Sequence, residues 1–410
     1  MTFCRSPFEF SALEIASGIA LGFDTTRSGA DAQPGADPLR ALEDAILPAL
    51  LHPPCVVSFS GGRDSAAVLA VASALARREG LAAPIAATNV FPGVEAASES
   101  RWQELVISHL GIEDWVRVQV HSELDCVGPI ATSILRRHGL LWPFNAHFHW
   151  PLLQIAYGGS LLTGIGGDEL LGTSQWARAV SVLSGRVRPT SRDLLRVSVA
   201  LAPRRVRAAA LRRRSGVRLP WLTEEANELL ARLLTREHAC EPLRWSRRWS
   251  WWRSRRQVTV GFESLNLLAA DHDVMIGHPL TDRHFALAAA RCASRGGIVE
   301  RTALVRALFG EVLPRALLER QSKASFDLVF WNEHSRRLAS ESAHWLSELG
   351  VVDQTGLRRA WHRPAPDAHS FLLLQALWLR TSDSSRCAPY SSASHLDLNG
   401  GPVGNIAPAT

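Results

Sequence analysis

One short segment constrains this chain more than any other: Ser58-Phe59-Ser60-Gly61-Gly62-Arg63-Asp64-Ser65, which directly follows the apolar run Cys55-Val56-Val57. The β-branched residues of that run predict a buried strand. Gly61 and Gly62 permit a tight turn and, because they lack Cβ atoms, a close approach of phosphate oxygens to the backbone. A helix predicted over 66–78 would point its free N–H groups at the same anion. The segment therefore predicts a pyrophosphate-binding turn in an α/β fold.

The pattern S-G-G-x-D-S fixes five positions, and it would arise by chance in roughly one chain of this length in a thousand. It contains no lysine, unlike the kinase-type loop G-x-x-x-x-G-K-[ST], which grips the β- and γ-phosphates with one. Asp64 instead offers a carboxylate that could hold a Mg²⁺ ion bridging the phosphates. The alternative interpretation is a glycine-rich turn that binds nothing.

A second glycine-rich turn follows about a hundred residues later, in Leu161-Leu162-Thr163-Gly164-Ile165-Gly166-Gly167-Asp168-Glu169-Leu170. A buried strand predicted over 160–163 leads into it, as a strand leads into the first turn. Neighbouring parallel strands would bring the two turns together. Asp64 and Asp168 could then hold one Mg²⁺–pyrophosphate from opposite sides.

Lysine is almost absent from the chain. Of the 45 lysines and arginines, only Lys323 is a lysine. A lysine ammonium is a compact charge with three rotatable donors, whereas guanidinium is a wide planar fork. That one lysine is kept among so many arginines suggests that arginine cannot replace it at this position. A position beside a crowded phosphate would have this requirement, because only the compact ammonium fits there. The alternative is that a rare residue stands there by accident.

The apolar pattern alternates strands with helices in the first half of the chain. This alternation predicts a parallel sheet with crossover helices, hence an α/β fold. After residue 172 the strand signals fade, and helices are predicted to dominate to about residue 383. The predicted strands are 55–57, 85–91, 115–120 and 160–163, and the predicted helices between them are 39–51, 66–78, 98–110, 124–138 and 145–157.

The predicted organisation is a single large domain with additions at both ends. Residues 1–36 are expected to be an extension with a linker, and 37–345 the nucleotide-binding domain. Residues 346–383 should form C-terminal helices. Residues 384–410 are rich in Ser, Gly, Pro and Ala, which predicts a disordered tail.

Composition excludes several classes of protein. The chain has 410 residues and is 46% apolar, which suffices for a large core, and it has no run of 18 apolar residues. We therefore expect no membrane-spanning helix, and the N-terminal segment lacks the pattern of a signal peptide. The six cysteines are scattered without a C-x-x-C pair, which argues against a zinc ribbon. We expect reduced thiols and a cytoplasmic location.

The basic character has a local origin. Arginines are dense over Arg186–Arg218 and over Arg244–Arg256, where Trp245, Trp249, Trp251 and Trp252 alternate with them. Arginine with tryptophan could bind nucleic acid or an acidic peptide. The favoured interpretation is a solvated helix face with tryptophans packed beneath it, and a nucleic-acid partner is not expected.

The two glycine-rich turns together resemble the synthetase domain of asparagine synthetases, which beta-lactam synthetases and lasso-peptide cyclases share. Three later segments resemble that family in the same order. They are His278-Pro279-Leu280-Thr281-Asp282, then Arg301–Arg306 with Leu313-Pro314, and Arg320-Gln321-Ser322-Lys323-Ala324-Ser325-Phe326, which is similar to the catalytic loop R-x-x-K-x-x-F. The resemblance covers roughly residues 37–345. It implies a parallel-sheet PP-loop domain, similar to adenine nucleotide α-hydrolases, with a mostly helical C-terminal part.

The resemblance implies that ATP activates a carboxylate. The carboxylate attacks the α-phosphorus, pyrophosphate leaves, and an amine displaces AMP from the acyl-adenylate to form an amide. It implies Lys323 as the catalytic residue, and Mg²⁺ bound by Asp64 and Asp168. The implied ATP- and pyrophosphate-binding residues are Ser58, Ser60, Gly61, Gly62, Asp64, Ser65 and Gly164.

Two positions depart from the family pattern. Glutamine-using asparagine synthetases begin with a glutaminase domain whose nucleophile is a cysteine at the second residue, whereas the second residue here is Thr2 and Cys4 lies in a short extension. Nitrogen is therefore expected from ammonia, from a substrate amine, or through a separate amidotransferase or substrate-delivery protein. Ile165 occupies a position where asparagine synthetases carry an acid and beta-lactam synthetases a tyrosine. Isoleucine cannot take a proton, so another base would be required.

Several other polar residues admit two interpretations. His147 and His149, beside Trp150, could line the acceptor pocket, although histidines near aromatic clusters are more often structural. Asp271 and Asp273 could contact substrate or Mg²⁺, although a solvated helix end is favoured. Glu99 and Glu104 are interpreted as surface or salt-bridge residues.

The favoured hypothesis is an ATP-dependent amide-forming ligase that tailors a peptide or small metabolite, for instance by macrolactam closure. The Arg244–Arg256 region could grip such a peptide, in which case neutralising its arginines would weaken binding. Alternatives are an ammonia-dependent asparagine synthetase, a tRNA-modifying PP-loop enzyme, and a binding protein with a degenerate site.

Overall fold

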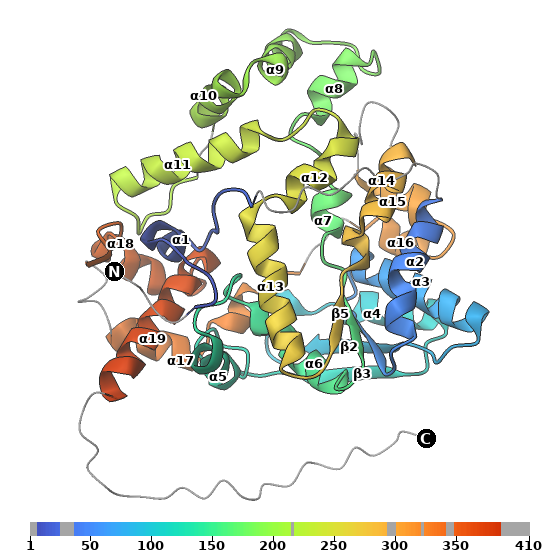
Figure 1. The fold of residues 1–410 in the computed structure, drawn as a ribbon. Helices are drawn as coiled ribbons and strands as arrows, with labels where there is room; N and C mark the ends of the chain where they lie inside the picture. The colour runs from blue at the N-terminus through green and yellow to red at the C-terminus, as the bar shows by residue number, and fades with distance from the viewer. Residues whose placement is uncertain are drawn as a thin grey trace, which may run out of the picture.

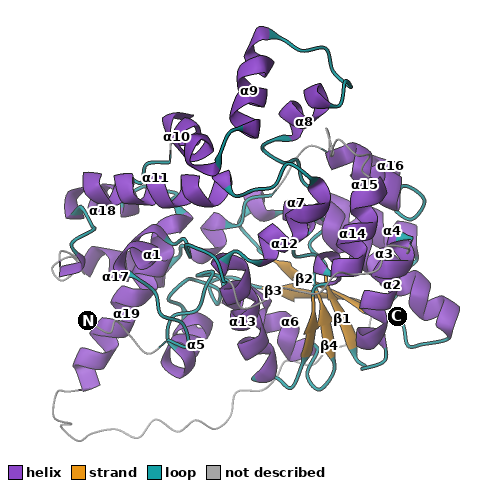
Figure 2. Cartoon of the chain, turned by 45° about the horizontal axis from the view of Figure 1, so that its top comes forward, coloured by secondary structure: helices purple, strands orange, loops and turns teal. Residues whose placement is uncertain are grey.

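The fold is built on one parallel sheet, seen in a computed structural model that describes residues 6–24, 37–214, 217–292, 301–320, 324–341 and 348–386. Five strands pair in the order β3-β2-β1-β4-β5, and every pairing is parallel (Figure 2). Their bounds are β1 Cys55–Ser58, β2 Ile85–Val90, β3 Trp115–Gln119, β4 Ser160–Leu162 and β5 Met275–Gly277. The predicted α/β fold with a parallel sheet is confirmed.

Alternation of side chains places helices on both faces of the sheet. Val57 packs in one buried cluster with α2 (Pro38–Leu50), α3 (Arg63–Glu79), α14 (Arg283–Cys292) and α15 (Arg301–Phe309). Its neighbour Val56 belongs to another cluster, which includes residues of α5 (Pro129–His138), α6 (Trp150–Ile155) and α13 (Arg256–Ala270). β1 and β4 are buried at every residue, as expected for central strands of a doubly covered sheet.

The strand order reverses beside β1. The chain moves outward from β1 to β2 and β3, then returns to place β4 on the other side of β1, with Cys55 paired to Ser160. Ligands of open parallel sheets bind at the carboxyl ends of strands where the order reverses. Both glycine-rich turns follow these two strands, so the topology places them at that point.

The boundaries of several elements differ from those predicted. The helix predicted over 124–138 begins at Pro129, because the Asp125 side chain accepts a hydrogen bond from Val127 N at 3.0 Å and makes a turn first. The helix predicted over 145–157 is a 3₁₀ turn, Ala146–His149, followed by α6. β5 lies where mainly helices were predicted, because three residues carry too little pattern to signal a strand.

Helices form most of the remaining structure, and their places are shown in Figure 1. Their bounds are α1 Ala12–Ser17, α4 Ser100–Leu110, α7 Gly167–Leu170, α8 Ala177–Leu183, α9 Ser191–Leu201, α10 Arg204–Arg214, α11 Glu224–Ala239, α12 Arg248–Arg253, α16 Arg315–Leu318, α17 Glu333–Glu341, α18 Gln354–Trp361 and α19 Phe371–Arg386. Residues 28–36 of the predicted linker lie outside the described residues, and so does the tail predicted over 384–410 except for 384–386, which are helical and belong to α19. Among the described helices, none is long and apolar enough to cross a membrane.

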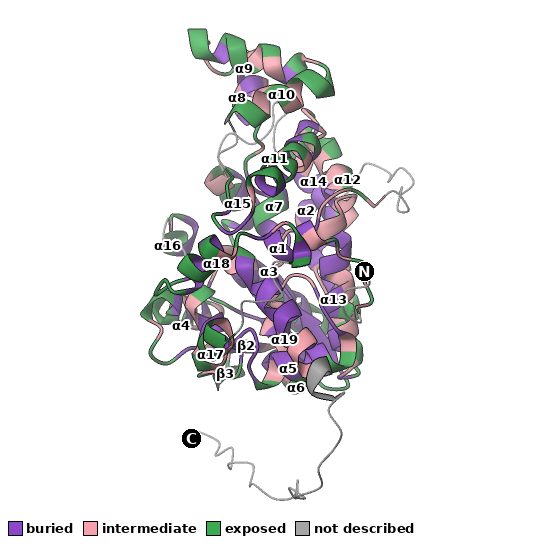
Figure 3. Ribbon diagram, turned by 90° about the vertical axis from the view of Figure 1, so that its left-hand side faces the viewer, coloured by how far each residue is buried: buried purple, intermediate pink, exposed green. Residues whose placement is uncertain are grey.

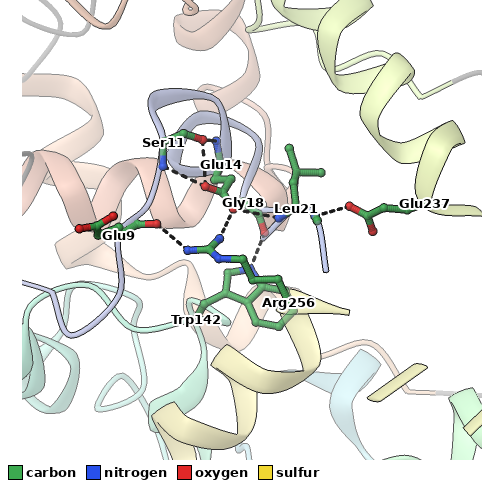
Figure 4. Close-up of polar contacts among 9 residues, drawn as sticks. Glu9, Ser11, Glu14, Gly18, Leu21, Trp142, Glu237 and Arg256 are labelled. Atoms are coloured by element: carbon green, nitrogen blue, oxygen red, sulfur yellow. Dashed lines mark hydrogen bonds and ion pairs between the residues drawn. The ribbon is translucent and has the colours of Figure 1, made fainter. Parts of the chain in front are cut away.

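The N-terminal segment is part of the helical core. Leu13, Ile15 and Ala16 of α1 are buried in one cluster with α19. A capping box joins Ser11 and Glu14, whose carboxylate also accepts from Leu21 N at 2.9 Å and pairs with Arg256 (Figure 4). These contacts fasten the start of the chain to α13, in the middle of the fold.

The tryptophans of the arginine–tryptophan region pack as expected, but several of its arginines do not face solvent. Arg248 pairs with Glu241 at 3.3 Å, and Arg255 with Glu237 at 3.5 Å. Arg256 pairs with Glu14, and the side chains of these three arginines are 12%, 13% and 24% exposed. The interpretation of a solvated helix face is thus wrong for these residues, because each meets a buried carboxylate. Neutralising them would disturb the fold, so such variants would not report on peptide binding.

An arm of three helices, α8 to α10, projects from the body of the molecule (Figures 1 and 3). Trp176, Ala179 and Ala200 form a small core of its own. Buried Asp193 holds Arg178 at 2.7 Å and Arg196 at 3.1 Å. The first arginine-rich segment therefore belongs to a separate projection, away from the sheet.

Candidate active site

The first turn is held in shape by its own serines. Ser60 N donates to Ser65 Oγ at 3.2 Å, and Gly62 N donates to Ser60 Oγ at 3.3 Å. Gly61 has a φ of 83°, a conformation that glycine adopts at little cost. Gly62 caps α3 without a side-chain hydrogen bond, so the first turn of this helix has no side-chain cap. Such an end suits a bound anion.

The second turn packs directly against the first. A Cβ atom on Gly164 would lie 2.7 Å from Ser65 N, and one on Gly167 would lie 2.2 Å from the carboxylate carbon of Asp64. Gly166 has a φ of 94° and faces the methyl group of Thr281. The glycines are therefore needed because two turns from neighbouring strands touch, in addition to any approach by a ligand.

Asp64 and Asp168 meet across one cation, Arg301. Arg301 Nη2 lies 2.6 and 2.7 Å from the two carboxylate oxygens of Asp64, and its Nη1 lies 2.5 Å from Asp168 Oδ1. Burial raises the pKa of Asp64 to about 6, and Arg301 opposes this rise. The expected juxtaposition of the two aspartates is present. Arg301 was not foreseen as a site residue, although it stands in a segment that resembles the family.

A cavity of about 450 Å³ opens over the two turns. This is within the range of small-molecule sites. Of the predicted residues, Ser58, Ser60, Gly62, Asp64, Ser65, Gly164 and Asp168 line it, and the other described lining residues are Arg63, Glu99, Asn145, Phe148, His149, Thr163, Ile165, Arg301, Arg320, Ala324, Phe326 and Phe330. Gly61 is not among them. The lining thus combines carboxylates and arginines with aromatic side chains.

Lys323 lies outside the described residues, but residues on both sides of it line the cavity. Arg320 pairs with Glu99, and both side chains are 6% exposed. Arg320 Nη1 also donates to the Gly61 carbonyl at 3.3 Å. The interpretation of Glu99 as a salt-bridge residue is therefore correct, although it is buried, while Glu104 is exposed. The segment that leads to Lys323 is fastened to the first turn.

Of the histidines and aspartates with two interpretations, His149 alone is among the described residues that line the cavity. His149 lines the cavity, and its Nδ1 lies 3.4 Å from Ser58 Oγ. His147 is buried, its Nε2 lies 3.0 Å from the Leu124 carbonyl, and it is not among the described lining residues. Asp271 pairs with Arg137 at 2.8 Å and His138 at 2.7 Å, before the amino end of β5 and away from the cavity. Neither Asp271 nor Asp273 is among the described lining residues. The expectation of a solvated helix end is wrong for Asp271, whose ion-paired side chain is 7% exposed, whereas Asp273 is exposed.

We expect Gly164→Ala to inactivate the site more than it destabilises the fold. The added methyl would meet the backbone of Ser65, so one of the two turns has to shift. A shift of about 1 Å at a positioned group can cost about a hundredfold in rate. Pyrophosphate release and thermal unfolding, measured side by side, check this. Gly80→Ala is the control: nothing surrounds that helix-end glycine, so activity should be kept, although its φ of 65° means that the methyl costs some stability. Full activity of Gly164→Ala would contradict the prediction.

We expect stability to fall in mild acid because of His278. Burial lowers the pKa of this imidazole to about 3, with His149 and Arg253 adding to the effect, and its Nε2 has no hydrogen-bond partner among the described residues. The unfolded chain binds the proton below its ordinary pKa of 6.5 while the folded chain does not, so the free energy of unfolding decreases as pH falls from there toward 3. By about pH 5 the loss is about 2 kcal/mol.

Urea unfolding at about pH 7.5 and 5 measures this loss. His278→Asn retains a group that can meet Thr163, whose Oγ1 lies 2.7 Å from His278 Nδ1, but it cannot titrate. This variant should lose about 2 kcal/mol of the pH dependence. An unchanged pH dependence would show that His278 is not responsible.

Comparison with known proteins agrees with this geometry. A search of curated proteins finds no significant match. The model of the family described as asparagine synthase matches residues 40–381, which include both turns, Arg301, Arg320 and Lys323. That match covers well over half of the 410 residues. The chain therefore belongs to the asparagine synthase family, whose members are ATP-dependent amide-forming synthetases.

Proposed function

We propose that this protein adenylates a carboxylate with ATP and passes the acyl group to an amine, forming an amide. The observation that carries the proposal is the meeting of the two turns over one cavity, with Asp64 and Asp168 on a shared cation. The N-terminus of α3 and the backbone around Gly62 would hold the leaving pyrophosphate, with Ser58, Ser60, Ser65 and Gly164 shaping its seat. Lys323 would stabilise charge that develops at the α-phosphorus.

The two aspartates fit a magnesium ion. Mg²⁺ is usually bound through one or two carboxylates together with substrate phosphates. Asp64 and Asp168 already converge on a positive group, which shows that their oxygens can face one cation. When bound there, the metal would neutralise charge on the pyrophosphate. Arg301 would then share the same anionic cluster from the start of α15.

The substrate we favour is a peptide or small metabolite that is tailored, as in macrolactam closure. The support is a group of aromatic side chains in the cavity lining: the ring centroid of Phe148 lies 5.9 Å from that of Phe326 and 6.2 Å from that of Phe330. Ile165 adds an apolar side chain to the lining of the same cavity. Apolar lining of this kind suits an acyl group larger than aspartate. A separate substrate-delivery or amidotransferase protein would be compatible, and the free thiols of Cys55, Cys126, Cys240 and Cys292 suit the cytoplasm.

The test is ATP–pyrophosphate exchange with Mg²⁺ and a panel of carboxylates: L-aspartate, L-glutamate, and peptides that carry a free amine and an acidic side chain. Exchange with a peptide, followed by AMP and amide formation, supports the proposal. Exchange with no member of the panel, from protein that binds ATP, overturns it. Asparagine made from aspartate and ammonium would replace it with an ammonia-dependent asparagine synthetase. Pyrophosphate release that requires tRNA would replace it with RNA modification.

A further inference from the structure

The amide-forming step releases a proton inside the cavity. The amine nitrogen bonds to the carbonyl carbon of the acyl-adenylate, the bond from that carbon to the adenylate oxygen breaks, and its electron pair leaves with AMP. The nitrogen then has to lose one proton. Most aliphatic amines are also protonated at neutral pH, and that first proton passes to water before the free amine attacks. A proton acceptor within reach of the amine is therefore required.

The carboxylates that line the cavity are already engaged. Asp64 and Asp168 share Arg301, and Glu99 pairs with Arg320. In the proposed reaction the two aspartates also face the metal and the phosphates. The acceptor has to be sought among the other residues that line the cavity.

His149 is an imidazole in the lining of the cavity. Its ring packs edge-on against Phe148, with centroids 5.4 Å apart, and its Nδ1 lies 3.4 Å from Ser58 Oγ at the end of β1. It lines the same cavity as Ile165. Burial lowers its pKa to about 4, so the ring is neutral at physiological pH and has a free lone pair. His278, after β5, is close enough to interact with it electrostatically, as Arg253 does with His278.

From this placement we infer that His149 is the general base of the amine step, an inference that rests on the proposed function. With the ring hydrogen on Nδ1 and directed to Ser58 Oγ, Nε2 keeps the lone pair. Nε2 takes the proton from the amine as the nitrogen–carbon bond forms, and the imidazolium returns it to water after AMP has left. Ser58 then positions the base, in addition to shaping the strand end.

The experiment compares two nucleophiles in His149→Gln and His149→Asn. Ethylamine is protonated at neutral pH, whereas hydroxylamine is not and needs little help from a base. The carboxylate is whichever member of the panel gives the fastest exchange in the unaltered protein. We expect both variants to keep ATP–pyrophosphate exchange within about threefold. Amide formation with ethylamine should fall at least a hundredfold, as the loss of a general base predicts, and hydroxamate formation less than tenfold.

The matched control is His147→Asn, which changes a histidine of the same 3₁₀ turn that is not among the described lining residues. It should affect the two nucleophiles equally. Equal losses in the His149 variants would overturn the inference, and so would unchanged ethylamine rates. If neither His149 variant folds, a solvent deuterium isotope effect in the unaltered protein decides: present with ethylamine only, it supports the base, and equal for both nucleophiles, it refutes it. Absence of exchange in the unaltered protein instead refutes the proposed function.

Discussion

Lys323→Arg is expected to lower the rate of ATP–pyrophosphate exchange by about two to three orders of magnitude while thermal unfolding stays unchanged. Because arginine keeps the positive charge of Lys323, the lower rate would come from the different shape of its side chain. A guanidinium is wider than an ammonium and presents its donors in a fixed plane, which suits a bidentate partner better than a crowded phosphorus. Arg320 and Ala324, the nearest described residues before and after Lys323, both line the cavity.

The control for this exchange is Arg315→Lys, the reverse change at a side chain that is 85% exposed. It should leave both rate and stability unchanged, because exposed ion pairs contribute little. A Lys323→Arg enzyme with at least half of the original rate would show that the only lysine of the chain has no special role. Loss of folding in that variant would equally contradict a catalytic assignment.

Arg320→Met is expected to destabilise the protein by about 3–5 kcal/mol, because it leaves the buried carboxylate of Glu99 without its cation. The Cζ atom of Arg320 also lies 5.0 Å from the ring centroid of Trp102, and its Nη1 donates a hydrogen bond to the Gly61 carbonyl. Its loss should therefore slow exchange as well, since the Gly61 carbonyl of the first turn loses its donor. Equilibrium unfolding in urea measures the first effect and pyrophosphate exchange the second.

The double variant Glu99→Leu, Arg320→Met separates the two effects. Replacing both members of a buried pair by apolar groups often restores stability. We expect most of the lost free energy to return while exchange remains slow, because the Gly61 carbonyl still lacks its donor. Additive losses in the double variant would show that the pair is not the cause. Recovery of exchange together with stability would remove the positional role of Arg320.

Much of the sheet could be predicted because local pattern determines it. Cys55-Val56-Val57 and Trp115–Gln119 carry β-branched or alternating residues between turn signals, and the strands lie within a residue or so of their predicted places. The meeting of the two turns followed from parallel pairing of β1 with β4, which the structure confirms. A pattern of only a few residues is enough to predict strands of this kind.

Partners that are distant in the sequence could not be predicted in this way. Arg301 reaches Asp64 across 237 positions, and Arg256 reaches Glu14 across 242. Nothing local distinguishes Arg256 from the arginines beside it, and the family-like segment that contains Arg301 does not indicate that this arginine meets Asp64. Each arginine is placed by the carboxylate that it meets, Asp64 or Glu14. Where those carboxylates lie depends on the whole fold and cannot be read from the neighbouring sequence. The same reason explains why the arginine–tryptophan region was expected to face solvent.

The packing of α1 against α19 sets the order in which the protein can be completed. About 350 residues separate the two helices, so the first is synthesised long before its partner exists. At ordinary translation speeds the delay is roughly 20 to 70 seconds. During that interval Leu13 and Ile15 lack the α19 side of the cluster in which they are finally buried. The sheet can form while the chain is still being synthesised. The buried cluster that contains α1 is complete only after α19, the last described helix, has been synthesised.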